Sequence, residues 1–198
     1  MTVGWQRGSG MTTARVPVGV GRVGLANVIT GSRLLIAVAA FILLLVAVGG
    51  REQPLMIAAA VLAGVSLLLD GIDGRVARAR HEASRFGAIF DNEADAATVA
   101  LLSVGLWING IAGWWVLLIG AMRYLFLLAG MVLPALRGRL PVSMLRKVLG
   151  ISQGISLALA LFGAAIHASA GWQLLPAIAL VGLFWSFGRD TVHLLTRR

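Results

Sequence analysis

The chain has no cysteine, which excludes disulfide bonds, thiolate metal sites and cysteine nucleophiles. Charged residues are scarce as well, at 13% of the 198 residues, whereas 59% of the residues are hydrophobic. The mean hydropathy is +0.90. A water-soluble domain of this size must expose a large share of its residues and could not bury so much apolar surface. The composition therefore predicts an integral membrane protein.

Internal repeats and low-complexity linkers are also missing, so we expect a single membrane domain over residues 25–198. Residues 1–24 are rich in glycine, contain three arginines and show no periodicity, which predicts a mobile basic cytosolic arm. Six apolar segments follow the arm, at residues 28–48, 55–69, 88–108, 114–136, 145–166 and 174–187. Most are close to the roughly 20 residues that cross a bilayer as a helix. Because backbone groups in lipid must be satisfied internally, the prediction is an all-α fold of six transmembrane helices.

The second segment is short, but a helix that continues through Val76 would bring Asp70 and Asp73 into the membrane interface. With six spans, both termini and the connections after spans two and four lie on one side of the membrane. That side holds fifteen of the seventeen basic residues, and the connections on the opposite side hold only Arg51. The positive-inside rule therefore predicts a multi-pass protein of the plasma (inner) membrane, with both termini and the helix ends that carry the aspartates on the cytosolic side.

The net charge of +9 raises the question of a nucleic-acid partner. However, the basic residues sit in short connections between apolar segments, and aromatic residues do not alternate with them. We therefore attribute the charge to contact with an anionic lipid bilayer and expect no nucleic-acid partner.

Acidic residues are few, and they are concentrated: six of the eight fall between positions 70 and 95. Asp70 and Asp73 are three residues apart, and Asp91 and Asp95 are four apart, so each pair shares one face of a helix. Converging carboxylates need compensating cations, and oxygen ligands favour Mg²⁺ or Mn²⁺. Two such ions can act together as a clamp for phosphoryl transfer. The alternatives are ordinary interfacial charges or the ion site of a divalent-cation transporter, although transporter sites usually lie near the bilayer midplane between repeated halves.

The acidic segment also carries a motif: Asp-x-x-Asp-Gly-x-x-Ala-Arg, eight residues, then Gly-x-x-x-Asp-x-x-x-Asp, which ends at Asp95. This pattern resembles the signature of the CDP-alcohol phosphotransferase family (CDP-alcohol phosphatidyltransferase class I). The segment Leu25–Arg33 is similar to the start of that family's first span, with Asn27, Thr30 and Arg33 in the expected places. Ala26 stands where the family often has proline.

The resemblance, which covers residues 25–150, implies a metal-dependent enzyme of phospholipid synthesis. Such an enzyme transfers a phosphatidyl-type group from a CDP-linked lipid, usually CDP-diacylglycerol, to the hydroxyl of a polar alcohol and releases CMP. By the same resemblance, two Mg²⁺ or Mn²⁺ ions would be bound by Asp70, Asp73, Asp91 and Asp95. Asp95 would also be the catalytic general base. The residues implied in donor binding are Asn27, Gly74, Arg78, Ser84 and Gly87.

The acceptor alcohol stays open, because Ala96 follows Asp95 where many relatives have a basic residue. Glycerol 3-phosphate, inositol phosphate, inositol and serine are all candidates, as is a non-catalytic lipid-binding role, although the presence of all four aspartates weighs against the last. Arg123 lies within the fourth apolar segment, where an arginine needs a polar cavity or a partner. We expect it to bind an anionic acceptor or the donor's phosphate; the structural alternatives are that it pairs with a carboxylate or extends its side chain to the membrane interface. Four further candidates for acceptor binding, which could equally be topogenic charge, are Arg137, Arg139, Arg146 and Lys147.

Two further expectations concern Glu93 and two glycines of the fourth apolar segment. Glu93 is two residues from Asp91 and should point away from the face shared by Asp91 and Asp95, outside the metal ligands. Gly120 and Gly130 suit either close helix packing or a homodimer contact, and the sequence favours neither.

Overall fold

The structure, a computed structural model, describes residues 25–48, 52–79, 85–132, 144–167 and 170–196. Every regular element in these ranges is helical, which confirms the all-α prediction for the described residues. The predicted basic arm at residues 1–24 lies outside them. The elements are α1 (Leu25–Val46), α2 (Gln53–Ala79), α3 (Arg85–Ile108), the 3₁₀ turn η1 (Trp114–Val116), α4 (Leu117–Val132), α5 (Met144–Ala165), the 3₁₀ turn η3 (Ala170–Gln173) and α6 (Leu174–Thr196).

Within the described ranges there are six α-helices, and they correspond one to one with the six apolar segments of the sequence. Helix α2 continues through Val76 to Ala79, as predicted, so Asp70 and Asp73 are both helical. Helix α6 runs nine residues beyond the predicted end at Phe187. The prediction ended there because it followed hydrophobicity, whereas the helix continues through a polar stretch.

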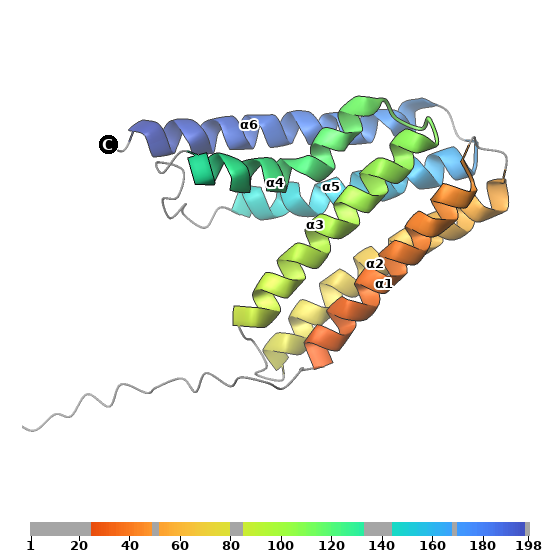
Figure 1. Cartoon of the computed structure of the whole chain (residues 1–198), viewed down its shortest axis with the longest axis horizontal. Helices are drawn as coiled ribbons and strands as arrows, with labels where there is room; N and C mark the ends of the chain where they lie inside the picture. Colours follow the sequence, from red (N-terminus) through yellow and green to blue (C-terminus); the bar gives the residue numbers. More distant parts are fainter. Residues whose placement is uncertain (1–24, 49–51, 80–84, 133–143, 168–169, 197–198) are drawn as a thin grey trace, which may run out of the picture.

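The helices form two groups that meet at one end and diverge toward the other (Figure 1). Helix α1 packs mainly against α2 and α3, α2 and α3 both contact α5, α3 contacts α4, and α5 contacts α6. The start of α1, the end of α2 and the start of α3 lie together at the diverging end (Figure 1).

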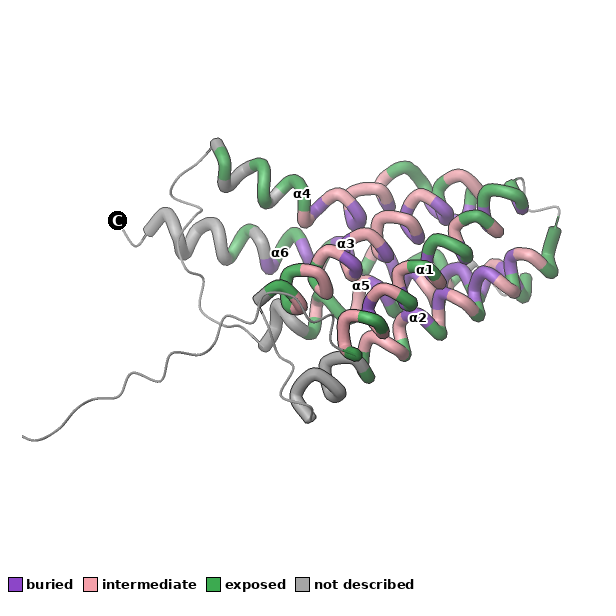
Figure 2. Tube along the Cα trace, turned by 60° about the horizontal axis from the view of Figure 1, so that its bottom comes forward, coloured by how far each residue is buried: buried purple, intermediate pink, exposed green. Residues whose placement is uncertain are grey.

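Small residues line the contacts between helices. Buried positions lie on the inward faces, with exposed positions on the outward faces (Figure 2). The core includes Ala40 and Leu44 of α1, Ala59 and Ala63 of α2, and Leu106 of α3. Gly120 of α4 is also buried, and a Cβ added to it would lie 2.8 Å from the Cα of Ala100 on α3. Gly120 therefore serves close helix packing, one of the two expected roles; only the backbone of Gly130 is described.

At the end where the two groups of helices meet, side chains form hydrogen bonds between helices. Asn109, just after α3, donates from Nδ2 to the carbonyl oxygens of Leu44 on α1, at 3.0 Å, and of Gly105, at 2.9 Å. Gln53 at the start of α2 donates from Nε2 to the carbonyl oxygen of Ala165 on α5, at 3.2 Å. These bonds join α1 to α3 and α2 to α5 at the opposite end from Asp70 and Asp95.

Large hydrophobic side chains cover much of the outward surface, for example Leu35, Leu68 and Val181. Among the described residues, three helical stretches are long and apolar enough to cross a membrane: Leu25–Val46, Gln53–Ile72 and Val148–Ala165. Two further apolar stretches, Trp114–Leu125 and Gly171–Ser186, are shorter. Helix α3 has the length, but its first half carries three acidic side chains.

Candidate metal centre and adjoining cavity

Three aspartates meet where α2 and α3 face each other. Asp70 lies on α2, and Asp91 and Asp95 lie one turn apart on α3. One carboxylate oxygen from each lies within 4.8 Å of the others. Their side chains are 33%, 41% and 47% exposed, respectively, so the group is open to solvent on one side. We call these three residues the acid cluster.

Arg33 of α1 lies against the protein side of the acid cluster. Its side chain is only 2% exposed, and its guanidinium donates hydrogen bonds to Oδ1 of Asp70 and Oδ1 of Asp95. Its Nη2 is also 3.3 Å from Oδ1 of Asp91. The Arg33 backbone carbonyl accepts a hydrogen bond of 3.1 Å from Oγ of Ser66 on α2. One guanidinium thus contacts all three carboxylates.

From the sequence, Arg33 was expected only as part of the segment Leu25–Arg33 and had no predicted role in the site. A signal was present, because an arginine nine residues into an otherwise apolar helix must find an anionic partner or a polar cavity. The partners could not be named from the sequence, since they lie 37 to 62 residues away.

The other predicted site residues differ in how far the structure describes them. Gly87, half-buried, lies one turn before Asp91 on α3, and Asn27, also half-buried, lies near the start of α1. For Asp73, Gly74 and Arg78 only the helical backbone of α2 is described, and for Arg146 and Lys147 only that of α5. Ser84, Arg137 and Arg139 lie outside the described residues.

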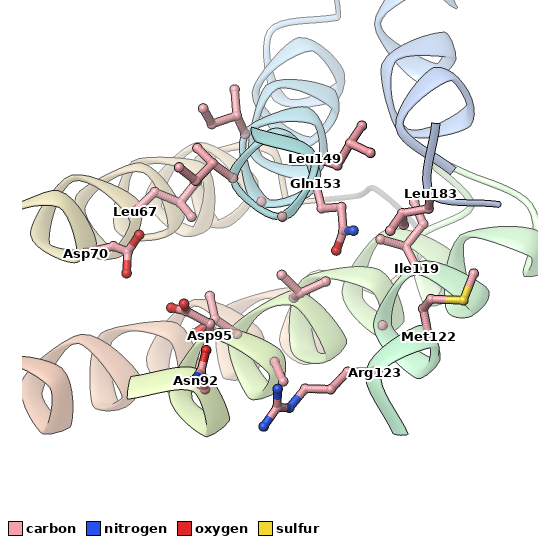
Figure 3. Close-up of a pocket in the computed structure, with 18 of the residues that line it drawn as sticks. Leu67, Asp70, Asn92, Asp95, Ile119, Met122, Arg123, Leu149, Gln153 and Leu183 are labelled. Atoms are coloured by element: carbon pink, nitrogen blue, oxygen red, sulfur yellow. The ribbon is translucent and has the colours of Figure 1, made fainter. Parts of the chain in front are cut away.

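A cavity of about 410 Å³ extends from the acid cluster between α2, α3, α4, α5 and α6, and Arg33 of α1 also contributes to its wall. Asp70 and Asp95 face it from opposite sides, and the Gln153 amide projects into it from α5 (Figure 3). Arg33, Thr98 and Ser186 add further polar groups to the wall. The rest of the wall is largely apolar and includes Leu67, Val99, Ile119, Met122, Leu149, Ile155 and Leu183. A ligand with a polar group near the carboxylates and an apolar portion beyond it suits this shape.

Arg123 of α4 also lines the cavity, and it forms an ion pair with Glu93 of α3 (Figure 3 shows Arg123). This contact is the structural alternative considered for Arg123 from the sequence. Its Nε atom is buried and has no hydrogen-bond partner among the described residues. Among the described residues, Glu93 is not one of the three converging carboxylates. Its exclusion from the metal ligands stays a prediction.

The donor set of the acid cluster fits a hard divalent cation. All three groups offer carboxylate oxygens, the ligand type that Mg²⁺ and Mn²⁺ prefer. The three aspartates and Arg33 together carry a net charge of −2 when all are ionised. An Oδ1 engaged by Arg33 leaves further acceptor capacity on the same carboxylate, because an ionised carboxylate has about four lone-pair sites.

Comparison with known proteins gives two findings. The family model described as CDP-alcohol phosphatidyltransferase matches residues 23–185 of the chain. Two proteins from Mycobacterium tuberculosis, of strains CDC 1551 / Oshkosh and ATCC 25618 / H37Rv, are each 30% identical to it over 135 residues. Each of them carries the name "Probable phosphatidylglycerophosphate synthase". The matched region is 68% of this chain and 64% of each relative, so the chain spans less than two thirds of these relatives.

Proposed function

The chain belongs to the CDP-alcohol phosphatidyltransferase family, and on that premise we propose that it transfers a phosphatidyl-type group from a CDP-linked lipid to an alcohol. CDP-diacylglycerol is the donor we infer, and CMP is the product released. The observation that carries the proposal is the acid cluster, which lies open to solvent beside a largely apolar cavity. Polar chemistry at the mouth of such a cavity suits a substrate with a charged headgroup and an acyl portion.

The metal ions of this reaction would be held by Asp70, Asp91 and Asp95 together with Asp73 of the same motif. When bound, a pair of Mg²⁺ or Mn²⁺ ions neutralises charge on the phosphates and acidifies a coordinated hydroxyl. The support for this assignment is the all-oxygen donor set and its net negative charge with Arg33 included.

Asp95 is the general base in this proposal. Its carboxylate takes the proton from the acceptor hydroxyl as the hydroxyl oxygen forms a bond to the β-phosphorus of the donor. The bond between that phosphorus and the oxygen of CMP breaks, and CMP leaves with the electron pair. Asp95 suits this role because it is the most exposed of the three carboxylates and also lines the cavity. By the resemblance to the family, we assign donor contacts to Asn27, Gly74, Arg78, Ser84 and Gly87.

We further propose a multi-pass membrane protein, with six spans, both termini in the cytosol and the acid cluster at the cytosolic boundary of the plasma membrane. Three helices with the length and composition of spans support the membrane assignment. The concentration of basic residues on one side of the chain's layout supports the orientation.

A phosphorylated acceptor is the first to test, and glycerol 3-phosphate is the leading candidate because the relatives are named phosphatidylglycerophosphate synthase. Inositol phosphate is the second. Arg123 reaches the cavity wall and could contact the acceptor phosphate there. Arg137, Arg139, Arg146 and Lys147 remain candidates for the same role.

The test is an assay of CMP release by the purified protein in detergent. The protein is incubated with Mg²⁺ and CDP-diacylglycerol, and glycerol 3-phosphate, inositol phosphate, inositol and serine are added separately. We expect CMP release above the acceptor-free background with a phosphorylated acceptor. Absence of CMP with every acceptor, together with Mg²⁺ or Mn²⁺ flux through proteoliposomes, would replace the transferase with a cation transporter.

A further inference from the structure

Arg33 is far less exposed to solvent than the three aspartates that it contacts. The guanidinium is almost fully buried, while the carboxylates it contacts are between one third and one half exposed. The acid cluster therefore lies between a buried cation on one side and water on the other. A metal ion that reaches the cluster from solvent would meet the face opposite Arg33.

Arg33 stays positively charged even though it is buried. An arginine side chain stays protonated in proteins, and a buried charge without a partner is strongly destabilising. Oγ of Ser66 donates a buried hydrogen bond to the Arg33 backbone carbonyl, and α1 packs against α2. These contacts keep Arg33 in place, so its positive charge is a constant feature of the site.

We propose that Arg33 is a resident counter-ion of the acid cluster, which compensates part of its negative charge and stays in place when metal ions bind. Arg33 acts through the aspartates and is thus a positioning residue. The inference depends on the metal dependence stated under the proposed function.

The proposal predicts how the metal-free protein behaves when the charge is removed. Without Arg33, the three carboxylates, whose oxygens lie within 4.8 Å of one another, would lose the positive charge that they share and repel one another more strongly. A bound divalent ion would relieve that repulsion, so metal should stabilise such a variant more than it stabilises the wild type. Removal of Arg33 also removes a positive charge that would repel a bound metal ion, so metal binding should become tighter.

The experiment compares Arg33→Gln, which removes the charge, with Arg33→Lys, which keeps it. Melting temperatures of the purified full-length proteins are measured in EDTA and in saturating MgCl₂ or MnCl₂, and Mn²⁺ affinity is measured by electron paramagnetic resonance. Arg123→Gln is the matched control, since it breaks an arginine–carboxylate pair that lies outside the acid cluster. An Arg33→Gln/Asp70→Asn double variant removes a cation and an anion together.

In EDTA we expect Arg33→Gln to melt about 10 °C below the wild type. Metal should raise its melting temperature more than it raises that of the wild type, and its Mn²⁺ dissociation constant should fall roughly tenfold. Arg33→Lys and Arg123→Gln should show a metal-induced rise close to that of the wild type. The double variant should melt above Arg33→Gln in EDTA.

An equal or smaller metal-induced rise in Arg33→Gln than in the wild type would overturn the counter-ion role. The same conclusion would follow if Arg33→Lys behaved like Arg33→Gln. If Arg33→Gln fails to fold, recovery of folded protein in the double variant supports the role, and failure of both overturns it. A wild type that neither metal stabilises would instead count against the metal dependence of the proposed function.

Discussion

Replacing Gly120 with alanine tests the packing that positions α3, the helix that carries Asp91 and Asp95. The added Cβ would lie 2.8 Å from the Cα of Ala100 and 3.3 Å from the Cβ of Ser103. Carbon atoms in contact prefer about 3.5–4.0 Å, so α3 and α4 must separate by roughly 0.7 Å or more. The obstructing atom belongs to a helix backbone and cannot rotate away as a side chain can.

The expected cost follows from two opposing terms. Overpacking of this kind destabilises a protein by about 1–3 kcal/mol. Alanine is the better helix former by about 0.8–1.0 kcal/mol, which offsets part of that cost. Gly64→Ala is the matched control, since Gly64 lies inside α2 and a Cβ there meets nothing within 4 Å. Comparing the two variants cancels the helix term, so Gly120→Ala should be the less stable by about 1–3 kcal/mol.

For a chain of this size each kcal/mol corresponds to about 2–4 °C, so the two melting temperatures should differ by about 2–12 °C. The six tryptophans allow the transition to be followed by intrinsic fluorescence in detergent. Because Gly120 also lines the cavity, CMP release should fall in Gly120→Ala and stay near the wild-type rate in Gly64→Ala. A Gly120→Ala protein that melts at or above Gly64→Ala would refute the close approach of α3 and α4.

Three further predictions concern the reaction itself. Asp95→Asn should retain binding of the CDP-linked donor but lower CMP release by at least about 10²-fold, since it removes the proposed base; retained turnover would remove Asp95 as the base. Incubation with EDTA should abolish CMP release, and MgCl₂ or MnCl₂, but not NaCl at matched ionic strength, should restore it. Arg123→Gln should raise the KM for a phosphorylated acceptor by about tenfold with little change in the KM for the donor; an unchanged acceptor KM would leave Arg123 with only its ion pair to Glu93.

The sequence predicted those features that depend on residues close together in the chain. Long apolar segments predicted six helices, because a hydrophobic run of that length has few other stable forms. The pairing of Asp91 with Asp95 also followed from spacing, since residues four apart share a helix face. The end of α6 was missed because hydrophobicity does not report where a helix continues through polar residues.

What could not be predicted depends on contacts between distant parts of the chain. Arg33 and its carboxylate partners come from three helices, and nothing in their spacing specifies that they meet. For Arg123, the sequence favoured an anionic substrate over a carboxylate partner and could not name the carboxylate, and only packing of α4 beside α3 brings it to Glu93. The cavity is likewise formed by residues of all six described α-helices together, and no segment of the sequence encodes it alone.

The hydrogen bonds of Asn109 fix one end of α3, and the acid cluster lies near the other end, so a small tilt of the helix moves the aspartates by a large distance. Asp91 lies 18 residues before Asn109 in the chain, which corresponds to roughly 27 Å of helix. At that radius a tilt of about 2° displaces a side chain by about 1 Å, and an error of that size can slow a reaction 10²-fold. The angular accuracy of α3 at the Asn109 end therefore sets the accuracy with which its two aspartates are placed, even though no reacting atom comes near Asn109.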